Sequence, residues 1–214
     1  MRNFKPLFVG AALAGSLVAS PLMAYEAGDF VARAGWARVS PNDSAENFEG
    51  VAGDVTVEDA DSLGLTFTYM FTDNIGLGVL GSWPFTVDIK GDSGALAGAG
   101  KLGEAKALPP TVTLQYHFNT GTALQPYIGA GVNYTYFFDE DTDGAIGALN
   151  LNLEDSFGLV GEAGVDFDLG NDYLVSAQVW YMQMSTQAHV SGGVGNADVD
   201  VDPWVFMIGI GKKF

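Results

Sequence analysis

The chain has 214 residues, with 9 basic and 26 acidic side chains, a formal net charge of −17 and no cysteine. So acidic a chain is a poor ligand for nucleic-acid phosphates, which are bound by lysine and arginine, and we expect no nucleic-acid partner. Without cysteine, an exported chain cannot be held together by disulfides. Although 48 % of the residues are apolar, no window beyond the first 24 residues is apolar for long enough to form a membrane helix.

The first 24 residues have the pattern of a secretory signal peptide. Arg2 and Lys5 form a charged start, residues 7–18 form an apolar run, and Ala24 is the small residue that ends it. Because this run is short for a membrane helix, we expect cleavage after Ala24 rather than retention as an anchor. Cleavage leaves one domain, residues 25–214, with 7 basic and 26 acidic side chains and a formal charge of −19.

Apolar residues alternate with small or polar residues eight times along the chain, which is the pattern of β-strands. The last segment, DPWVFMIGIGKKF at residues 202–214, carries aromatic residues near both ends and has the length of a tilted transmembrane strand. Strands in lipid need partners on both edges, which requires a closed barrel. The predicted strands are residues 30–39, 62–71, 75–84, 111–118, 126–138, 156–169, 173–182 and 202–214.

The connections between these segments alternate strictly between short and long. Short links are predicted at residues 72–74, 119–125 and 170–172, and long loops at residues 41–60, 85–108, 139–154 and 183–201. This pattern predicts an all-β, eight-stranded antiparallel up-and-down transmembrane β-barrel, with both termini on the short-turn, periplasmic side. Pro84 should interrupt its ladder, because proline has no N–H to donate.

Eight strands leave room inside for side chains or one small ligand, but not for a wide water pore. A soluble eight-stranded binding barrel is the alternative, and it would turn its apolar face inward. Here the larger, continuous apolar face carries the aromatic residues at its edges, which favours the membrane form.

Four charged or titratable residues have the parity of the lumen face: Arg33, His117, Glu162 and Asp166. An arginine facing lipid at mid-depth is costly, so Arg33 should point inward. Glu162 and Asp166 lie near each other on the lumen side, with Arg33 and His117 as candidate partners. A polar plug near the periplasmic end is favoured over catalysis, because no nucleophile, base and orienting group fall together. The sequence therefore does not predict an enzyme.

Six stretches, in chain order, are similar to the motifs of a known family: LGLTFTYM (63–70), TDNIG (72–76), LPPT (108–111), PYIGAGVNYTYFFD (126–139), VWYM (179–182) and DPWVFMIGIGKKF (202–214). They closely resemble the outer membrane protein W (OmpW) family, which includes the alkane-import protein AlkL and the OprG-type porins. The resemblance implies an eight-stranded barrel in the outer membrane of a Gram-negative bacterium. It also implies passive uptake of small hydrophobic molecules through a narrow apolar lumen that is closed toward the periplasm, with sideways exit through the wall.

The resemblance further implies a gate made of a leucine and a tryptophan. Alignment of TDNIG and VWYM places these residues at Leu80 and Trp180, and strand parity separately directs both side chains inward. Met70, also on the lumen side, would add soft apolar lining. The implied partners are the lipid bilayer, lipopolysaccharide, small hydrophobic molecules and the assembly machinery that reads the C-terminal strand. Lys212 departs from the family, which usually has an aromatic residue there.

An acidic motif, D-x-D-x-D-G at residues 139–144, matches the opening of a calcium loop. Its twelfth position is Asn150, where the bidentate glutamate of such a loop should stand, so a solvated acidic loop is the favoured interpretation. His117 and His189 are far apart in the strand pattern, which argues against a shared metal site. We therefore expect no metal and no cofactor.

Two other functions remain open from the sequence. The barrel could be a channel for small polar solutes, as proposed for some relatives. Alternatively it could be a structural or surface-receptor protein whose acidic loops bind phage, bacteriocins or host factors.

Overall fold

The computed structural model describes residues 25–42, 44–45, 55–91, 101–142, 151–190 and 195–214. The predicted signal peptide, residues 1–24, lies outside the described residues. No helix within these ranges is long and apolar enough to cross a membrane.

Two sheets make up the described part of the chain. The strands are β1 Phe30–Ser40, β2 Ser44–Ala45, β3 Val55–Val57, β4 Ala60–Met70, β5 Ile75–Ser82, β6 Phe85–Gly91, β7 Lys101–Leu108, β8 Thr111–His117, β9 Leu124–Thr142, β10 Leu151–Leu153, β11 Ser156–Gly170, β12 Tyr173–Met182, β13 Ser185–Val190, β14 Gly195–Asp200 and β15 Trp204–Lys213.

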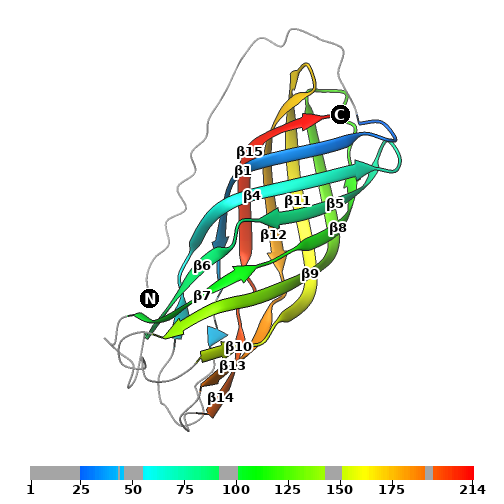
Figure 1. Cartoon of the computed structure of the whole chain (residues 1–214). Coiled ribbons are helices and arrows are strands. Elements are labelled where there is room, and N and C mark those ends of the chain that lie inside the picture. The colour runs from blue at the N-terminus through cyan, green and yellow to red at the C-terminus, as the bar shows by residue number, and fades with distance from the viewer. Residues whose placement is uncertain (1–24, 43, 46–54, 92–100, 143–150, 191–194) are drawn as a thin grey trace, which may run out of the picture.

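Within the described ranges, eight of these strands close into an antiparallel barrel, in the order β11-β12-β15-β1-β4-β5-β8-β9, with β9 pairing back onto β11. Figure 1 shows the tilted strands, with β1 and β15 side by side although they lie at opposite ends of the chain. The predicted eight-stranded antiparallel barrel is confirmed.

The two terminal strands approach each other through glycines. Gly35 of β1 lies opposite Gly209 of β15, and a Cβ built on Gly35 would lie 2.2 Å from the carbonyl oxygen of Ile208. Such a separation is far inside van der Waals contact, so only glycine permits this approach.

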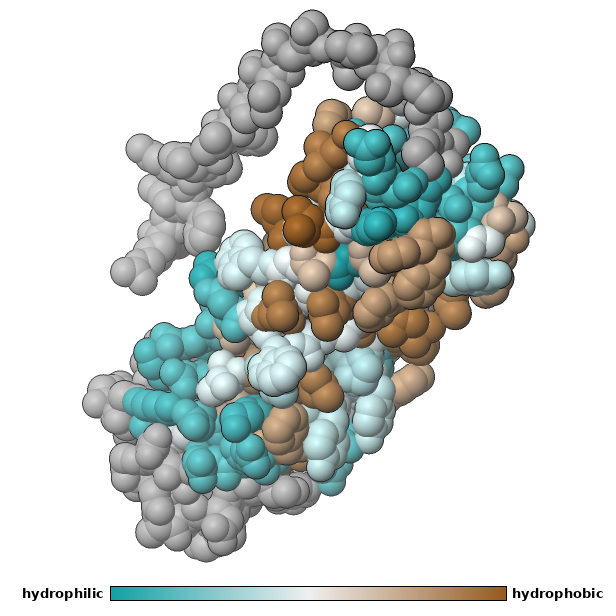
Figure 2. All heavy atoms as spheres, turned by 45° about the horizontal axis from the view of Figure 1, so that its top comes forward, coloured by the Kyte–Doolittle hydropathy of each residue, from teal (hydrophilic) through white to brown (hydrophobic). Residues whose placement is uncertain are grey.

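The outer wall of the barrel is apolar, whereas the inner wall mixes polar, small and apolar residues. In β4 every second residue from Leu63 to Tyr69 is exposed, whereas Thr66, Thr68 and Met70 are buried. Figure 2 shows apolar residues gathered over the middle of the visible face, with hydrophilic residues toward both ends. Aromatic pairs stand at the two rims, for example Tyr136 with Phe138 at 5.6 Å and Tyr116 with Phe118 at 5.0 Å.

The predicted long loops are wrong in part, because strands continue into them. Residues 85–108 form the β6–β7 hairpin instead of a loop, apart from residues 92–100, which lie outside the described ranges. β9 extends to Thr142, and β2, β3, β10, β13 and β14 occupy parts of the other three loops. In β6 the more exposed face carries Thr86, Asp88 and Lys90, so the apolar outer face that marks the barrel strands is missing there.

Candidate functional site: the barrel lumen

A buried ion pair lies in the half of the lumen nearest the short turns. Arg33 is 2 % exposed, and its Nε and Nη2 donate to the two oxygens of Asp166 at 3.0 and 2.5 Å. Its Nη1 donates to Thr68 at 2.9 Å. This two-pronged, charge-assisted arrangement satisfies charges that would be very costly to bury alone.

The second buried carboxylate, Glu162, is held by neutral donors. The hydroxyl of Thr113 donates to it at 2.5 Å, and Nε2 of Gln115 lies 3.0 Å from both of its oxygens. His117 is joined to this set through Gln115, at 3.1 Å, and its ring stacks on Tyr127 with centroids 4.6 Å apart. The structure therefore brings Arg33 and Asp166 into direct contact, but His117 contacts neither carboxylate through a hydrogen bond.

Small residues on the inner wall make room for this polar network. A Cβ on Gly164 would lie 2.3 Å from the ring of Tyr127, and one on Gly78 would lie 2.2 Å from the amide of Gln115. Gln178 of β12 donates to the hydroxyl of Tyr127 of β9, which links two strands across the intervening β11. The glycines of the inner face thus allow large polar side chains to fill a narrow lumen.

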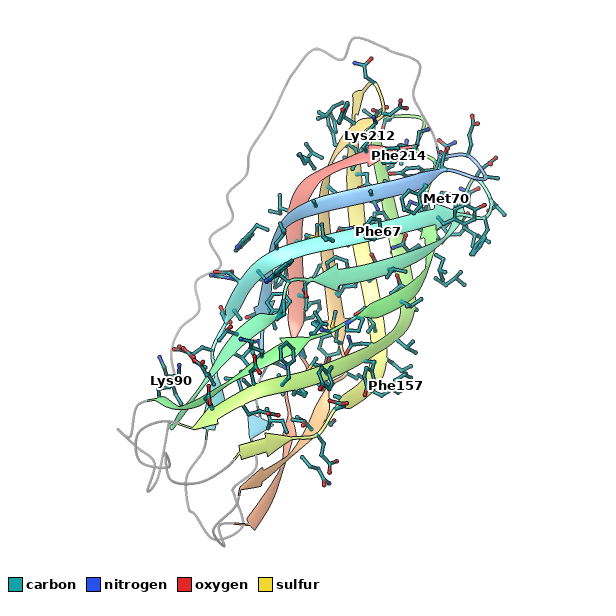
Figure 3. All side chains as sticks on the ribbon, in the orientation of Figure 1. Phe67, Met70, Lys90, Phe157, Lys212 and Phe214 are labelled. Carbon is teal, nitrogen blue, oxygen red and sulfur yellow. The ribbon has the colours of Figure 1, made fainter. Side chains whose placement is uncertain are left out.

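An apolar cluster fills the lumen on the other side of the polar network. Leu80 and Trp180 both belong to it and are 4 % and 1 % exposed. Its other members are Ala37, Val39, Ala60, Phe85, Val87, Ala105, Val160, Met182, Val205 and Met207. Met70 lies elsewhere, in a small cluster with Tyr25, Val31 and Leu174. Figure 3 shows Met70 on the half of the barrel that carries Lys212 and Phe214, away from Lys90.

The wall of the barrel is interrupted beside the apolar cluster. The β5–β8 ladder ends at the pair of Leu80 with Thr111, and pairing resumes at Phe85 with Ala107 in β6 and β7. Residues 81–84 and 108–110 lie between these two rungs and form no ladder pair with each other, although Gly81 and Ser82 still pair with β4 and Leu108 with β9. Along this short stretch the two facing segments are therefore not joined by a ladder.

Proline accounts for this gap. Pro84 lies on one side of it and Pro109 and Pro110 on the other, and none of the three can donate a backbone hydrogen bond. Trp83 still donates to β4 at 2.9 Å and Pro110 still accepts from β9 at 3.1 Å, so each side of the gap stays bound to its other neighbour. The side chain of Trp83 is 73 % exposed.

Beyond the barrel wall, the β6–β7 hairpin carries ion pairs. Lys101 lies 2.6 Å from Glu104 and 2.9 Å from Asp88, and Lys106 lies 2.9 Å from Asp139. Hydrogen bonds to Glu104 and Asp88 raise the pKa of Lys101 above its ordinary value, and the bond to Asp139 raises the pKa of Lys106.

Only part of the acidic motif at residues 139–144 lies within the described residues. Asp139 ends in the ion pair with Lys106 and Asp141 is exposed, while residues 143 and 144 lie outside the described ranges. Within the described part of the chain, no group of three or more His, Asp or Glu side chains could hold a metal ion. His117 lies in the lumen, and His189 lies in β13, in the other sheet.

Sequence reasoning missed several members of the polar network. Gln115 and Gln178 have inward parity but carry no charge, and Tyr127 is hidden in an aromatic-rich strand. Tyr25 precedes the first strand, so parity says nothing about it, yet it is buried and donates to Asp166. Polarity on the inner face, rather than charge alone, is the signal that could have found the glutamines.

The profile of the OmpW family matches residues 26–214 of this chain. The chain belongs to the OmpW family. It is 41 % identical over 216 residues to outer membrane protein W of Vibrio cholerae, covering 98 % of this chain and 100 % of that protein. It is similar to the crystal structure of OprG from Pseudomonas aeruginosa, with a TM-score of 0.83, 43 % identity and coverage of 90 % and 99 %. It is also 26 % identical to outer membrane protein AlkL of Ectopseudomonas oleovorans, covering 89 % of this chain and 84 % of that one.

Membership in the OmpW family, together with the apolar outer wall, identifies an outer-membrane β-barrel of a Gram-negative bacterium. The OmpW relatives are outer-membrane barrel proteins, which is consistent with a channel.

Proposed function

We propose that this OmpW-family barrel takes up small hydrophobic molecules passively, and that Leu80 and Trp180 form its gate. The observation that carries the proposal is the order of layers in the lumen, with an apolar cluster around Leu80 and Trp180 beyond a network of buried charges. A hydrocarbon can pass among apolar side chains, whereas ions and water lose their hydration there without compensation.

The exit is proposed to be sideways, into the membrane. Leu80 lies at the last rung before the gap in the wall, and Phe85, also in the apolar cluster, lies at the first rung after it. Movement toward the periplasm would require an apolar molecule to displace the ion pair of Arg33 and Asp166. Movement through the gap breaks no ladder hydrogen bond, so the lateral route has the smaller barrier.

Uptake of a radiolabelled alkane by a strain that lacks this gene, complemented with variants, tests the proposal. The variants Leu80→Gln and Trp180→Gln put an amide into the gate, and each should lower uptake about tenfold if it adds about 1.4 kcal/mol to the barrier. Trp204→Gln, on the exposed outer wall, is the matched control and should leave uptake unchanged. Equal uptake by all strains would refute the channel.

The lateral exit has its own variant. Replacing Pro109 and Pro110 by alanine restores two N–H donors at the gap and should reduce uptake if molecules leave there. Unchanged uptake, with the gate variants still impaired, would overturn the lateral exit and keep the channel.

Passage of small polar solutes is the second candidate, because the inner wall on the periplasmic side is polar. Swelling of proteoliposomes in glycine, compared with uptake of the alkane, separates the two functions.

A further inference from the structure

The segment that precedes the first barrel strand is fastened across the periplasmic mouth. The N–H of Ala27 donates to the carboxylate of Asp73 at 3.0 Å, and the N–H of Gly28 donates to the carbonyl of Met70 at 2.8 Å. Gly28 has a φ of 100°, a conformation that favours glycine, and so turns the chain toward β1. Residues 25–29 therefore form a strap bound to the β4–β5 turn.

This strap inserts one side chain into the barrel. Tyr25 is 5 % exposed and packs with Val31, Met70 and Leu174. Its ring meets His117 edge-on, with centroids 4.9 Å apart. A buried phenol needs a partner for its hydroxyl, and here the hydroxyl donates to Asp166 at 2.5 Å. The strap is thus joined to the same carboxylate that holds Arg33.

A recess with several charged side chains adjoins Tyr25. It is lined by Tyr25, Gln125, Asp166, Asp168, Asp172, Tyr173, Leu174 and Lys213. Its charged members beyond the network are Asp168 at the end of β11, Asp172 on the following turn and Lys213 at the end of β15, and all three are partly exposed. Asp166 lines this recess together with Tyr25, so the residue that the ring of Tyr25 shields from it is Val31, which is fully buried.

We propose that Tyr25 is a removable stopper that seals the lumen against periplasmic water. Its ring forms an apolar layer between the polar network and the periplasmic mouth. The strap holds the ring in place, although residues 25–29 are not part of a barrel strand. The inference does not depend on uptake of apolar molecules, because the proposed lateral route leaves the lumen on the far side of the network.

Chemical access to position 31 tests the stopper. The chain contains no cysteine, so Val31→Cys provides a single thiol directly behind Tyr25. In the folded protein in detergent micelles, a charged, water-soluble maleimide should label this thiol slowly. Adding Tyr25→Ala should raise the labelling rate at least about tenfold, because the local opening that exposes the thiol no longer has to break the stopper contacts. Tyr25→Phe, which keeps the ring, should raise it less.

Two further variants keep the test decisive. Asp73→Ala, on an exposed turn, removes one hydrogen bond of the strap without touching the lumen, and should speed labelling by less than Tyr25→Ala does. Tyr116→Ala removes a tyrosine from the outer wall and should leave the rate unchanged. The difference in gel mobility between folded and heated samples reports that each variant is folded. Fast labelling of Val31→Cys with Tyr25 intact, or an unchanged rate with Tyr25→Ala and with Asp73→Ala, would overturn the proposal.

Discussion

The pair of Arg33 and Asp166 places a full charge of each sign inside the barrel. Replacing Asp166 by asparagine leaves the guanidinium buried without its counter-charge, and we expect a loss of about 3–5 kcal/mol in the free energy of unfolding. Urea unfolding, followed by circular dichroism, measures this loss.

The matched control is Arg38, whose guanidinium donates to Asp61 at 2.7 and 2.8 Å on the exposed surface. Arg38→Gln should leave the urea midpoint unchanged within error, because exposed ion pairs contribute little. If both variants shifted the midpoint equally, burial would not be what makes the lumen pair important.

Lys101 provides a prediction about pH. Its pKa is raised on folding by Glu104 and Asp88. Its contribution to stability is therefore fully present below the ordinary lysine pKa and is lost only as the pH rises through the raised value. The ion pairs of the hairpin should persist through the neutral range and into alkaline solution.

NMR of isotopically dimethylated lysines can follow this titration. In the double variant Glu104→Gln and Asp88→Asn, the pKa of Lys101 should return toward its ordinary value. A pKa that is the same in both proteins would contradict the ion-pair geometry.

Single residues of the lumen were predictable where charge and parity coincide. The sequence predicts inward side chains at four positions, and the structure has all four buried in the lumen: Arg33, His117, Glu162 and Asp166. Which of them touch was not predictable, because contact across the barrel depends on the stagger between strands that are far apart in sequence. Whether Leu80 and Trp180 act as a gate remains a prediction.

At the scale of elements, the contact between β1 and β15 closes the barrel through Gly35. Gly35→Ala would place a Cβ 2.2 Å from the carbonyl of Ile208, so strands must move apart. We expect a loss of about 1–3 kcal/mol in the free energy of unfolding, measured by urea titration of the folded protein.

Gly161→Ala is the control, because a Cβ at Gly161 meets nothing within 4 Å. It should unfold at the same urea concentration as the parent. Equal stability of both variants would show that the approach of β1 and β15 is not as tight as the structure has it.

The strands themselves differ in how far the sequence predicts them. The barrel strands were found because lipid imposes an apolar outer face, which makes the period of two visible. In β6 the polar residues Thr86, Asp88 and Lys90 form the more exposed face. They alternate with the apolar residues Phe85, Val87 and Ile89. Alternation is present in that hairpin, but the amphipathic contrast that identifies a lipid-facing strand is not.

At the scale of the whole molecule, side chains on the outer wall face lipid, whereas side chains in the lumen pack against one another. The four tryptophans report this division: Trp36 and Trp204 are exposed on the outer wall, Trp83 at the gap, and Trp180 is buried inside. In single-tryptophan variants, brominated acyl chains should strongly quench the fluorescence of Trp36 and Trp204 and leave that of Trp180 nearly unchanged. Quenching of Trp180 like that of Trp204 would place it on the lipid side.

The length of β9 has a consequence for any molecule that arrives from outside. This strand has 19 residues, whereas a tilted strand needs only about 9–11 to cross the hydrocarbon. The surplus extends the strand by about 26–33 Å along its own direction, at roughly 3.3 Å for each residue. For the proposed uptake, this means that an apolar molecule would leave bulk water well above the membrane surface and pass the hydrated layer inside the extended barrel, instead of diffusing through that layer.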